Sequence, residues 1–191
     1  MLPFGHLAGG YLAGMWVLKR LGKSQARGYR LLGLLGGMLP DLDFIPYALA
    51  RGRLEMGEDY NHHTWISHAL PVYWLAGAAG WLWGRKRGDE RLQTASLVLA
   101  AAATAHLLQD TIGTVDGIMF AWPFSRRMIV FHSIGTHGRA WVRQYTRDPV
   151  FALEWLLVGL AVVVERQEEN YSPAHTSNHA ASASSNFKVF A

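Results

Sequence analysis

The 191-residue chain contains no cysteine, and only 17% of its residues are charged. Without cysteine it can form neither disulfide bonds nor Cys-ligated zinc and iron–sulfur sites, so any bound metal must have nitrogen and oxygen ligands. Hydrophobic residues make up 50% of the chain and include eight tryptophans. The length is sufficient for one domain with a substantial core.

The charge balance is basic, with 18 Lys and Arg against 14 Asp and Glu. The basic residues form short clusters between apolar runs rather than a stripe interleaved with exposed aromatics, so we do not expect nucleic-acid binding. The first apolar stretch has no basic region ahead of it and no small-residue cleavage site, so we expect no removable signal peptide.

Five apolar segments predict an all-α fold, a bundle of about five helices. Each segment is shorter than the roughly 20 residues that a membrane span needs. Residues 1–164 are expected to form one helical membrane domain that binds metal, and residues 165–191 a disordered polar tail, with His175 and His179 in it. The expected helices are Pro3–Leu18, Leu31–Leu39, Ser67–Gly84, Thr94–Leu108 and Val150–Val164.

The order of charges along these helices favours a membrane protein. If successive helices alternate in direction, the His and Asp residues at their ends fall on one side and the basic loops on the other. The positive-inside rule then makes the basic side cytoplasmic. This pattern predicts a multi-pass protein of the inner (plasma) membrane with a ligand cluster at its outer end. A soluble helical bundle would produce the same clustering and stays an alternative.

Three histidines lie within residues 61–68, at the mouth of the third apolar segment. Imidazole is the commonest side-chain metal ligand and also suits acid–base chemistry near neutrality. His63 is the best metal ligand of the three. His68, expected at the helix start, is a ligand or a catalytic proton relay, and His62 is a catalytic or supporting group, or a bystander. The alternative is a helix start that is rich in histidine and binds no metal.

His106 and Asp110 are four residues apart, which places both side chains on one face of a helix, where they can hold one ion or bridge two. Asp41 and Asp43 straddle Leu42 and both could point to the same cluster, although Asp43 could instead cap a helix that begins near Phe44.

His6 is a ligand candidate because it falls on the ligand side, although a lone histidine on an apolar helix is more often a core residue. The predicted metal ligands are therefore His6, Asp41, Asp43, His63, His106 and Asp110. His132 and His137 repeat the five-residue spacing of His63 and His68, but surface or substrate-facing roles suit them equally well.

Five elements occur in a characteristic order: an early His, Leu-Pro-Asp-x-Asp, His-x4-His, His-x3-Asp and Trp-Pro-Phe. They are found at His6, at residues 39–43, at His63 and His68, at His106 and Asp110, and at residues 122–124. In this the chain resembles bacterial and archaeal integral-membrane proteins described as membrane-bound metal-dependent hydrolases. That family includes a LexA-regulated inner-membrane protein and is distantly similar to zinc-dependent phospholipase C.

The chain departs from this family pattern around the histidine pair. The family has Arg-Gly after the first histidine and Thr-His-Ser at the second, whereas this chain has Thr64-Trp65 and Ser67-His68-Ala69. The missing arginine puts in doubt any phosphate contact that it would make.

The resemblance implies a hydrolase in which one or two divalent ions, most simply Zn²⁺, activate a water molecule. A site at the membrane surface favours membrane lipid as a partner and a phospholipid or another phosphodiester as the substrate. The alternative is a non-catalytic membrane protein whose metal is structural, sensed or transported. A transport path would continue ionisable residues down the helices, and here they are confined to one end.

Overall fold

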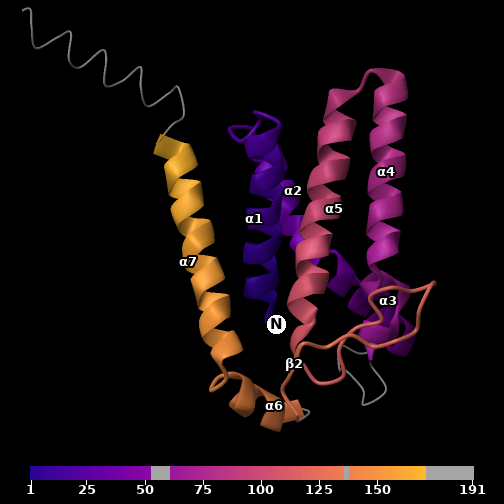
Figure 1. Cartoon of the computed structure of the whole chain (residues 1–191), viewed down its shortest axis with the longest axis vertical. Helices are drawn as coiled ribbons and strands as arrows, with labels where there is room; N and C mark the ends of the chain where they lie inside the picture. The colour runs from indigo at the N-terminus through magenta and orange to yellow at the C-terminus, as the bar shows by residue number, and fades with distance from the viewer. Residues whose placement is uncertain (53–60, 136–137, 171–191) are drawn as a thin grey trace, which may run out of the picture.

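The structure, a computed structural model, describes residues 1–52, 61–135 and 138–170. These fold mainly into helices, which confirms the all-α prediction (Figure 1). The seven α-helices are α1 (Pro3–Arg20), α2 (Arg27–Met38), α3 (Phe44–Arg51), α4 (Leu70–Arg87), α5 (Glu90–Asp110), α6 (Gly138–Tyr145) and α7 (Pro149–Asn170). Three single 3₁₀ turns precede α3 and α4: η1 (Pro40–Asp43), η2 (His62–Thr64) and η3 (Ile66–His68). Two short strands, β1 (Ile112–Thr114) and β2 (His132–Ser133), pair in parallel.

The long helices stand side by side and alternate in direction (Figure 1). Helix α1 packs against α2, α5 and α7, and α4 packs against α5. The turns that join α1 to α2 and α4 to α5 lie at the end far from the N-terminus. As a result the start of α1, the end of α2, the start of α4 and the end of α5 meet at one end, as the alternating directions predict.

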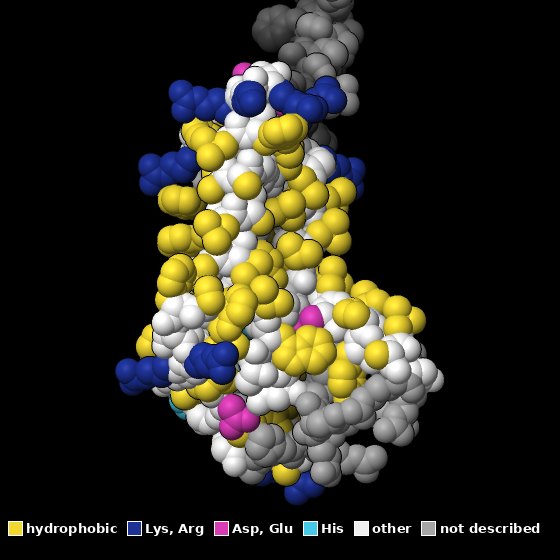
Figure 2. All heavy atoms as spheres, turned by 90° about the vertical axis from the view of Figure 1, so that its right-hand side faces the viewer, with side chains coloured by type: hydrophobic (Ala, Val, Ile, Leu, Met, Phe, Trp, Pro, Cys, Tyr) yellow, Lys and Arg dark blue, Asp and Glu magenta, His cyan; other side chains and the backbone are white. Residues whose placement is uncertain are grey.

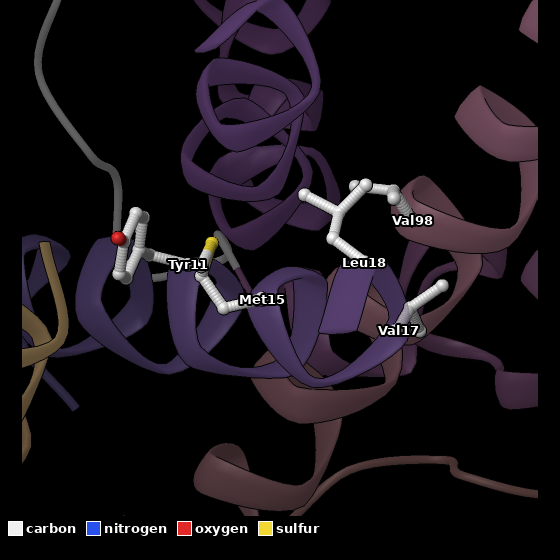
Figure 3. Close-up of a cluster of buried hydrophobic side chains, with 5 residues drawn as sticks. All are labelled: Tyr11, Met15, Val17, Leu18 and Val98. Carbon is white, nitrogen blue, oxygen red and sulfur yellow. The ribbon is translucent and has the colours of Figure 1, made fainter. Parts of the chain in front are cut away.

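The apolar core lies between α1 and α5. Figure 3 shows Leu18 of α1 beside Val98 of α5, with Met15 and Tyr11 further along α1. All four side chains are almost completely buried. Burial of a large apolar side chain stabilises a fold by about 1.5–3 kcal/mol. Partly buried side chains of α2, α5 and α7 also pack against this cluster, so it holds these helices around α1.

Helices α1 and α2 approach so closely because glycines face glycines. Gly10 and Gly14 of α1 lie against Gly33 and Gly37 of α2, and a Cβ on Gly10 would overlap the backbone of Gly37. Small residues four apart on both helices permit backbone contact, as in membrane bundles. This packing brings the first turn of α1, which carries His6, against the last turn of α2.

Three predicted helix starts are wrong, each for a local reason. The second helix begins at Arg27 instead of Leu31, since Arg27 to Arg30 already form its first turn. The third begins at Leu70 instead of Ser67, because residues 62–68 form 3₁₀ turns and Pro71 suits a first helical turn. The fourth begins at Glu90, because the Asp89 carboxylate caps it by accepting from Leu92 N–H at 2.9 Å.

The last helix extends to Asn170, beyond the predicted end at Val164. Its final turns are held by tertiary contacts. Glu165 Oε2 accepts from Arg30 Nη1 at 2.9 Å, and Glu168 Oε1 pairs with Lys19 Nζ at 3.0 Å. Residues 171–191 of the predicted polar tail, with His175 and His179, lie outside the described residues.

Apolar side chains also cover the outer faces of the helices. Figure 2 shows them along the face that includes α4, with Lys and Arg side chains at the upper end and further ones near the lower end. Trp74, Leu75, Leu82 and Trp83 of α4 are each at least half exposed. By length and composition alone, one helix within the described ranges, α5, qualifies as a membrane span; the sequence-based expectation was about five.

Candidate metal centre

Histidine and aspartate side chains from five elements converge at the end of the bundle where α1 begins and α5 ends. Each element presents one or two of them. They are His6 from the first turn of α1, Asp41 and Asp43 from η1, His62 and His63 from η2, His68 from η3, and His106 and Asp110 from the last turns of α5.

His106 and Asp110 form the innermost pair. His106 Nε2 lies 2.9 Å from Asp110 Oδ2, and His106 Nδ1 lies 2.6 Å from the carbonyl oxygen of Gly37. A carbonyl only accepts, so Nδ1 carries the proton that it donates to Gly37. In the neutral ring the Nε2 lone pair then faces a carboxylate oxygen. Two such electron pairs at this distance repel each other unless a cation or a second proton lies between them.

His68 is completely buried and stands between two sets of carboxylates. Its Nε2 lies 3.6 Å from Asp41 Oδ1 and 3.7 Å from Asp110 Oδ2. On the other side of the ring, Nδ1 lies 3.4 Å from Asp43 Oδ2, which also accepts from Ser67 Oγ at 2.6 Å. A carboxylate on one ring nitrogen that orients the other toward a metal is a common arrangement around metal sites.

Asp43 therefore contacts His68 and does not cap α3, and its role as a metal ligand stays a prediction. It occupies the residue position just before α3, yet its side chain makes no capping hydrogen bond to that helix. The sequence predicts His68 at the start of a helix. In the structure it ends the 3₁₀ turn η3, two residues before α4 begins at Leu70.

His6 closes the cluster from the side of α1. Its ring stacks on that of His106 with centroids 3.9 Å apart, and its Nε2 lies 3.2 Å from Asp110 Oδ1. The ligand atoms of His6, Asp41 and His106 lie within 4.8 Å of one another. His6 is thus part of the cluster and not an isolated core histidine.

His62 and His63 stack on each other at the rim, with ring centroids 4.4 Å apart. His63 Nε2 lies 4.0 Å from Asp110 Oδ2, whereas His62 Nδ1 lies 3.4 Å from Asp43 Oδ1. The backbone of this turn is fixed by Met119 N–H, which donates to His63 O at 3.0 Å. The two neighbouring histidines therefore face different carboxylates.

The donor atoms in this cluster fit a divalent cation. His68 Nε2, His106 Nε2 and Asp110 Oδ2 are buried with no hydrogen-bond partner outside this set, and ligand atoms of these three residues lie within 4.8 Å of one another. Buried polar atoms are normally paired, so a convergent unpaired set indicates a ligand. Imidazole and carboxylate donors suit Zn²⁺ and its neighbours among the transition metals.

The electrostatics of the loop residues also suit metal binding. Burial alone would raise the pKa of Asp41, but its contacts with His106 and His68 hold it well below its usual range. Contacts with His62, His68 and Ser67 likewise outweigh burial and lower the pKa of Asp43. Burial lowers the pKa of His63 to about 3. Near neutrality the carboxylates are ionised and His63 is neutral, which are the states in which these groups bind metal.

A cavity of about 660 Å³ opens onto the cluster. Its volume lies within the usual range of small-molecule sites. One part of its wall is formed by cluster residues, including His6, Asp41, His63 and Asp110, and another part is apolar, with Leu2, Pro3, Met38 and Phe44. The cavity also touches Asn61, Thr114, Asp116 and Trp141, which the sequence patterns did not single out. An amphiphilic molecule would match this wall.

His132 lies outside the cluster. It is half exposed, and its Nε2 pairs with Asp148 Oδ2 at 2.9 Å between β2 and the start of α7. His137, the other half of that predicted pair, lies outside the described residues. Glu154 was missed by sequence reasoning: it is completely buried in α7 and accepts from Leu2 N–H at 2.7 Å and from Tyr145 Oη at 2.6 Å.

The fold and the cluster together define an all-α protein whose helical bundle has an apolar outer surface and holds a His/Asp ligand set at one end. The chain belongs to the family of YdjM inner membrane proteins, whose family model matches residues 1–171. The prediction of an inner-membrane protein family is thereby confirmed, whereas the hydrolase activity stays a prediction. The match covers every element of the cluster. Comparisons with curated proteins and with solved structures give no match.

Proposed function

We propose that this protein is a membrane-embedded metal-dependent hydrolase that acts on a phosphodiester or phospholipid-type substrate. One observation carries the proposal: His68 Nε2, His106 Nε2 and Asp110 Oδ2 converge with no hydrogen-bond partner outside this set, and Asp110 lines a substrate-sized cavity. A divalent ion held there would lower the pKa of a bound water and polarise a phosphoryl oxygen.

The number of donors supports two ions. A catalytic zinc uses three protein ligands and keeps one position open. The cluster contains His68, His106 and Asp110 as one possible set. His106 Nε2 binds a single ion because its Nδ1 donates to a backbone carbonyl, so a second ion would use His6 and Asp41. Asp110 could serve both, because its Oδ1 faces His6 and its Oδ2 faces His106. Paired ions of this kind are common in enzymes that cleave phosphodiesters.

His62 is the proposed proton-transfer residue. It lines the cavity, and its Nδ1 lies 3.4 Å from Asp43 Oδ1 and 3.7 Å from Asp41 Oδ1. Carboxylates beside one nitrogen hold an imidazole in a fixed orientation, with the second nitrogen directed elsewhere to accept or donate a proton. His68 is fully buried between carboxylates on both sides, so we assign it as a ligand and not as a relay.

The bundle is proposed to lie in the inner membrane as a multi-pass protein. Helices α1, α4, α5 and α7 have 18 to 22 residues and are about 27–33 Å long, close to the hydrocarbon thickness of about 30 Å. α2 is the shorter fifth member. Support comes from the large apolar side chains exposed on outer faces, among them Leu75 of α4 and Leu156 of α7. Such a surface would be unusual in water.

The ends of α1 and α4 support one orientation, although Arg126 and Arg143 lie at the cluster end. Lys19 and Arg20 end α1, and Arg85, Lys86 and Arg87 end α4, all at the end far from the ligand cluster. The positive-inside rule places that end in the cytoplasm and the metal centre at the outer surface.

Along α7, the layout supports a site more than an ion path. Its ionisable residues Glu154 and Glu165 are separated by ten apolar or glycine residues, about 16 Å along the helix. A path would need polar groups at closer intervals. The hydrolysis assay described next distinguishes the proposed enzyme from a non-catalytic metal-binding protein.

The test is hydrolysis of a chromogenic phosphodiester and of phospholipid in mixed micelles, by Zn²⁺-loaded protein with and without chelator. We expect chelator-sensitive turnover in the wild type. His62→Gln should keep the metal and lose turnover, and His106→Gln should lose both. His132→Gln, which removes a histidine outside the cluster, is the matched control and should retain both. Stoichiometric metal without chelator-sensitive hydrolysis would support the non-catalytic alternative.

A further inference from the structure

One acidic residue of the cavity wall is not part of the histidine cluster. Three aspartates line the described part of the cavity: Asp41, Asp110 and Asp116. A carboxylate oxygen of Asp41 lies 3.5 Å from His106 Nε2, and one of Asp110 lies 2.9 Å from it. Both carboxylates are therefore part of the His/Asp cluster. Asp116 is exposed, and within the described ranges no hydrogen bond or ion pair involves its carboxylate.

The backbone ties Asp116 to the metal centre. Thr114 Oγ1 donates to the carbonyl oxygen of Asp110 at 2.9 Å and accepts from Gly117 N–H at 3.2 Å. Gly113 and Gly117 both have positive φ, at 82° and 77°, which favours glycine and makes the segment turn sharply. The turn therefore holds Asp116, which directly precedes Gly117, at a fixed place relative to Asp110.

An aromatic ring lines the same cavity. Trp141 of α6 is fixed by two contacts: its Nε1–H donates to the carbonyl oxygen of Gly113 at 3.2 Å, and its ring stacks on Tyr145 with centroids 4.6 Å apart. Asp116 and Trp141 both line this cavity. A carboxylate and a tryptophan can bind an ammonium ion, the first by charge and the second through its π face.

We propose that the Asp116 and Trp141 wall recognises a cationic head group, so that the substrate is a phosphodiester bearing an amine, such as an aminoalcohol phospholipid. This rests on the proposed function, in which the phosphodiester lies at the His/Asp cluster. The ammonium group then contacts Asp116 and Trp141, and the apolar part of the molecule lies against Met38 and Phe44.

The test is calorimetric binding of two soluble diesters of similar size to the Zn²⁺-loaded full chain with His62→Gln as the background, which keeps the metal and prevents turnover during the titration. The diesters are glycerophosphoethanolamine, which carries an amine, and glycerophosphoglycerol, which carries hydroxyls instead. We expect the amine diester to bind about tenfold more tightly, the effect of about 1.4 kcal/mol. Asp116→Asn should remove most of this preference. Glu169→Gln, which neutralises an exposed carboxylate at the opposite end of the bundle, should keep it.

Equal binding of the two diesters by the His62→Gln protein would overturn the inference, as would a preference that survives in Asp116→Asn. Binding of neither diester would also overturn it. These outcomes are distinct from failure of the proposed function, which is read from metal content and from chelator-sensitive turnover and not from the ratio of the two affinities.

Discussion

The Nδ1 of His106 and the carbonyl oxygen of Gly37 lie 2.6 Å apart, across the contact between α5 and α2. Gly37 also lies against Gly10 and the backbone of His6 in α1. The glycine that lets α1 and α2 touch thus presents the carbonyl that orients His106. Helix packing and ligand geometry depend on the same residue.

Gly37→Ala should therefore damage both stability and the metal centre. The added Cβ would overlap the carbonyl oxygen of His6 and lie 3.0 Å from Gly10 Cα, and overpacking of this kind typically costs about 1–3 kcal/mol. Gly28→Ala in the same helix is the control, because nothing lies within 4 Å of its added Cβ, and its stability should stay the same or rise by up to about 1 kcal/mol. Thermal unfolding in detergent measures both. Equal melting temperatures of the two variants would contradict the packing account.

Glu154 should be needed to hold α7 against the start of α1. Glu154→Leu leaves the partly buried Leu2 N–H and the buried Tyr145 O–H without their acceptor, and a buried unsatisfied donor costs about 1–3 kcal/mol. Glu154→Gln keeps one acceptor oxygen and should be milder. Unfolding of the three proteins, measured side by side, tests the order wild type, Gln, Leu. A Leu variant as stable as the wild type would exclude this role.

His63 should make the metal-free protein less stable as the pH falls. Burial lowers its folded-state pKa to about 3, below the ordinary value of about 6.5. Between these values the unfolded chain binds a proton that the folded chain does not, so stability is lost on acidification, by on the order of 1 kcal/mol per pH unit. His63→Gln should flatten the fall in melting temperature from about pH 6.5 to about pH 4.5 in chelator. An unchanged slope would show that His63 titrates normally.

The absence of cysteine makes the proposed orientation easy to test with single introduced cysteines. Lys86→Cys lies at the basic end of α4, and Arg126→Cys lies beyond α5, on the side of the metal centre; both positions are exposed. A membrane-impermeant maleimide applied to intact cells with a permeable outer membrane should label position 126 only. Labelling of position 86 alone before the inner membrane is permeabilised would indicate the opposite orientation. Equal labelling of both positions would contradict a spanning bundle.

Apolar segments and their alternating directions predicted the main helices, because those depend on local composition. Helix ends were less predictable. The end of α7 depends on Glu165 meeting Arg30, 135 residues away in the sequence, and no local pattern indicates such a contact. The start of α5 was indicated by Asp89, a typical N-cap residue that the apolar pattern did not take into account.

The site shows the same division. His6, Asp41, His63, His106 and Asp110 could be grouped because each lies at an apolar helix end on one side of the bundle. The role of Asp43 could not be predicted, because its contact with Ser67 depends on how η1 and η3 pack. Asp116 and Trp141 belong to segments without a recognised motif, and only the turn closed by Thr114 and the docking of α6 bring them to the cavity.

The metal content of the purified protein tests the central claim most directly. After dialysis against metal-free buffer, elemental analysis of the wild type should find about one to two equivalents of a divalent transition metal per chain. The double variant His106→Ala with Asp110→Ala should lose most of it, and His132→Gln should retain it. A wild-type protein without bound metal, even after incubation with Zn²⁺, would contradict the metal centre, as would a double variant that holds as much metal as the wild type.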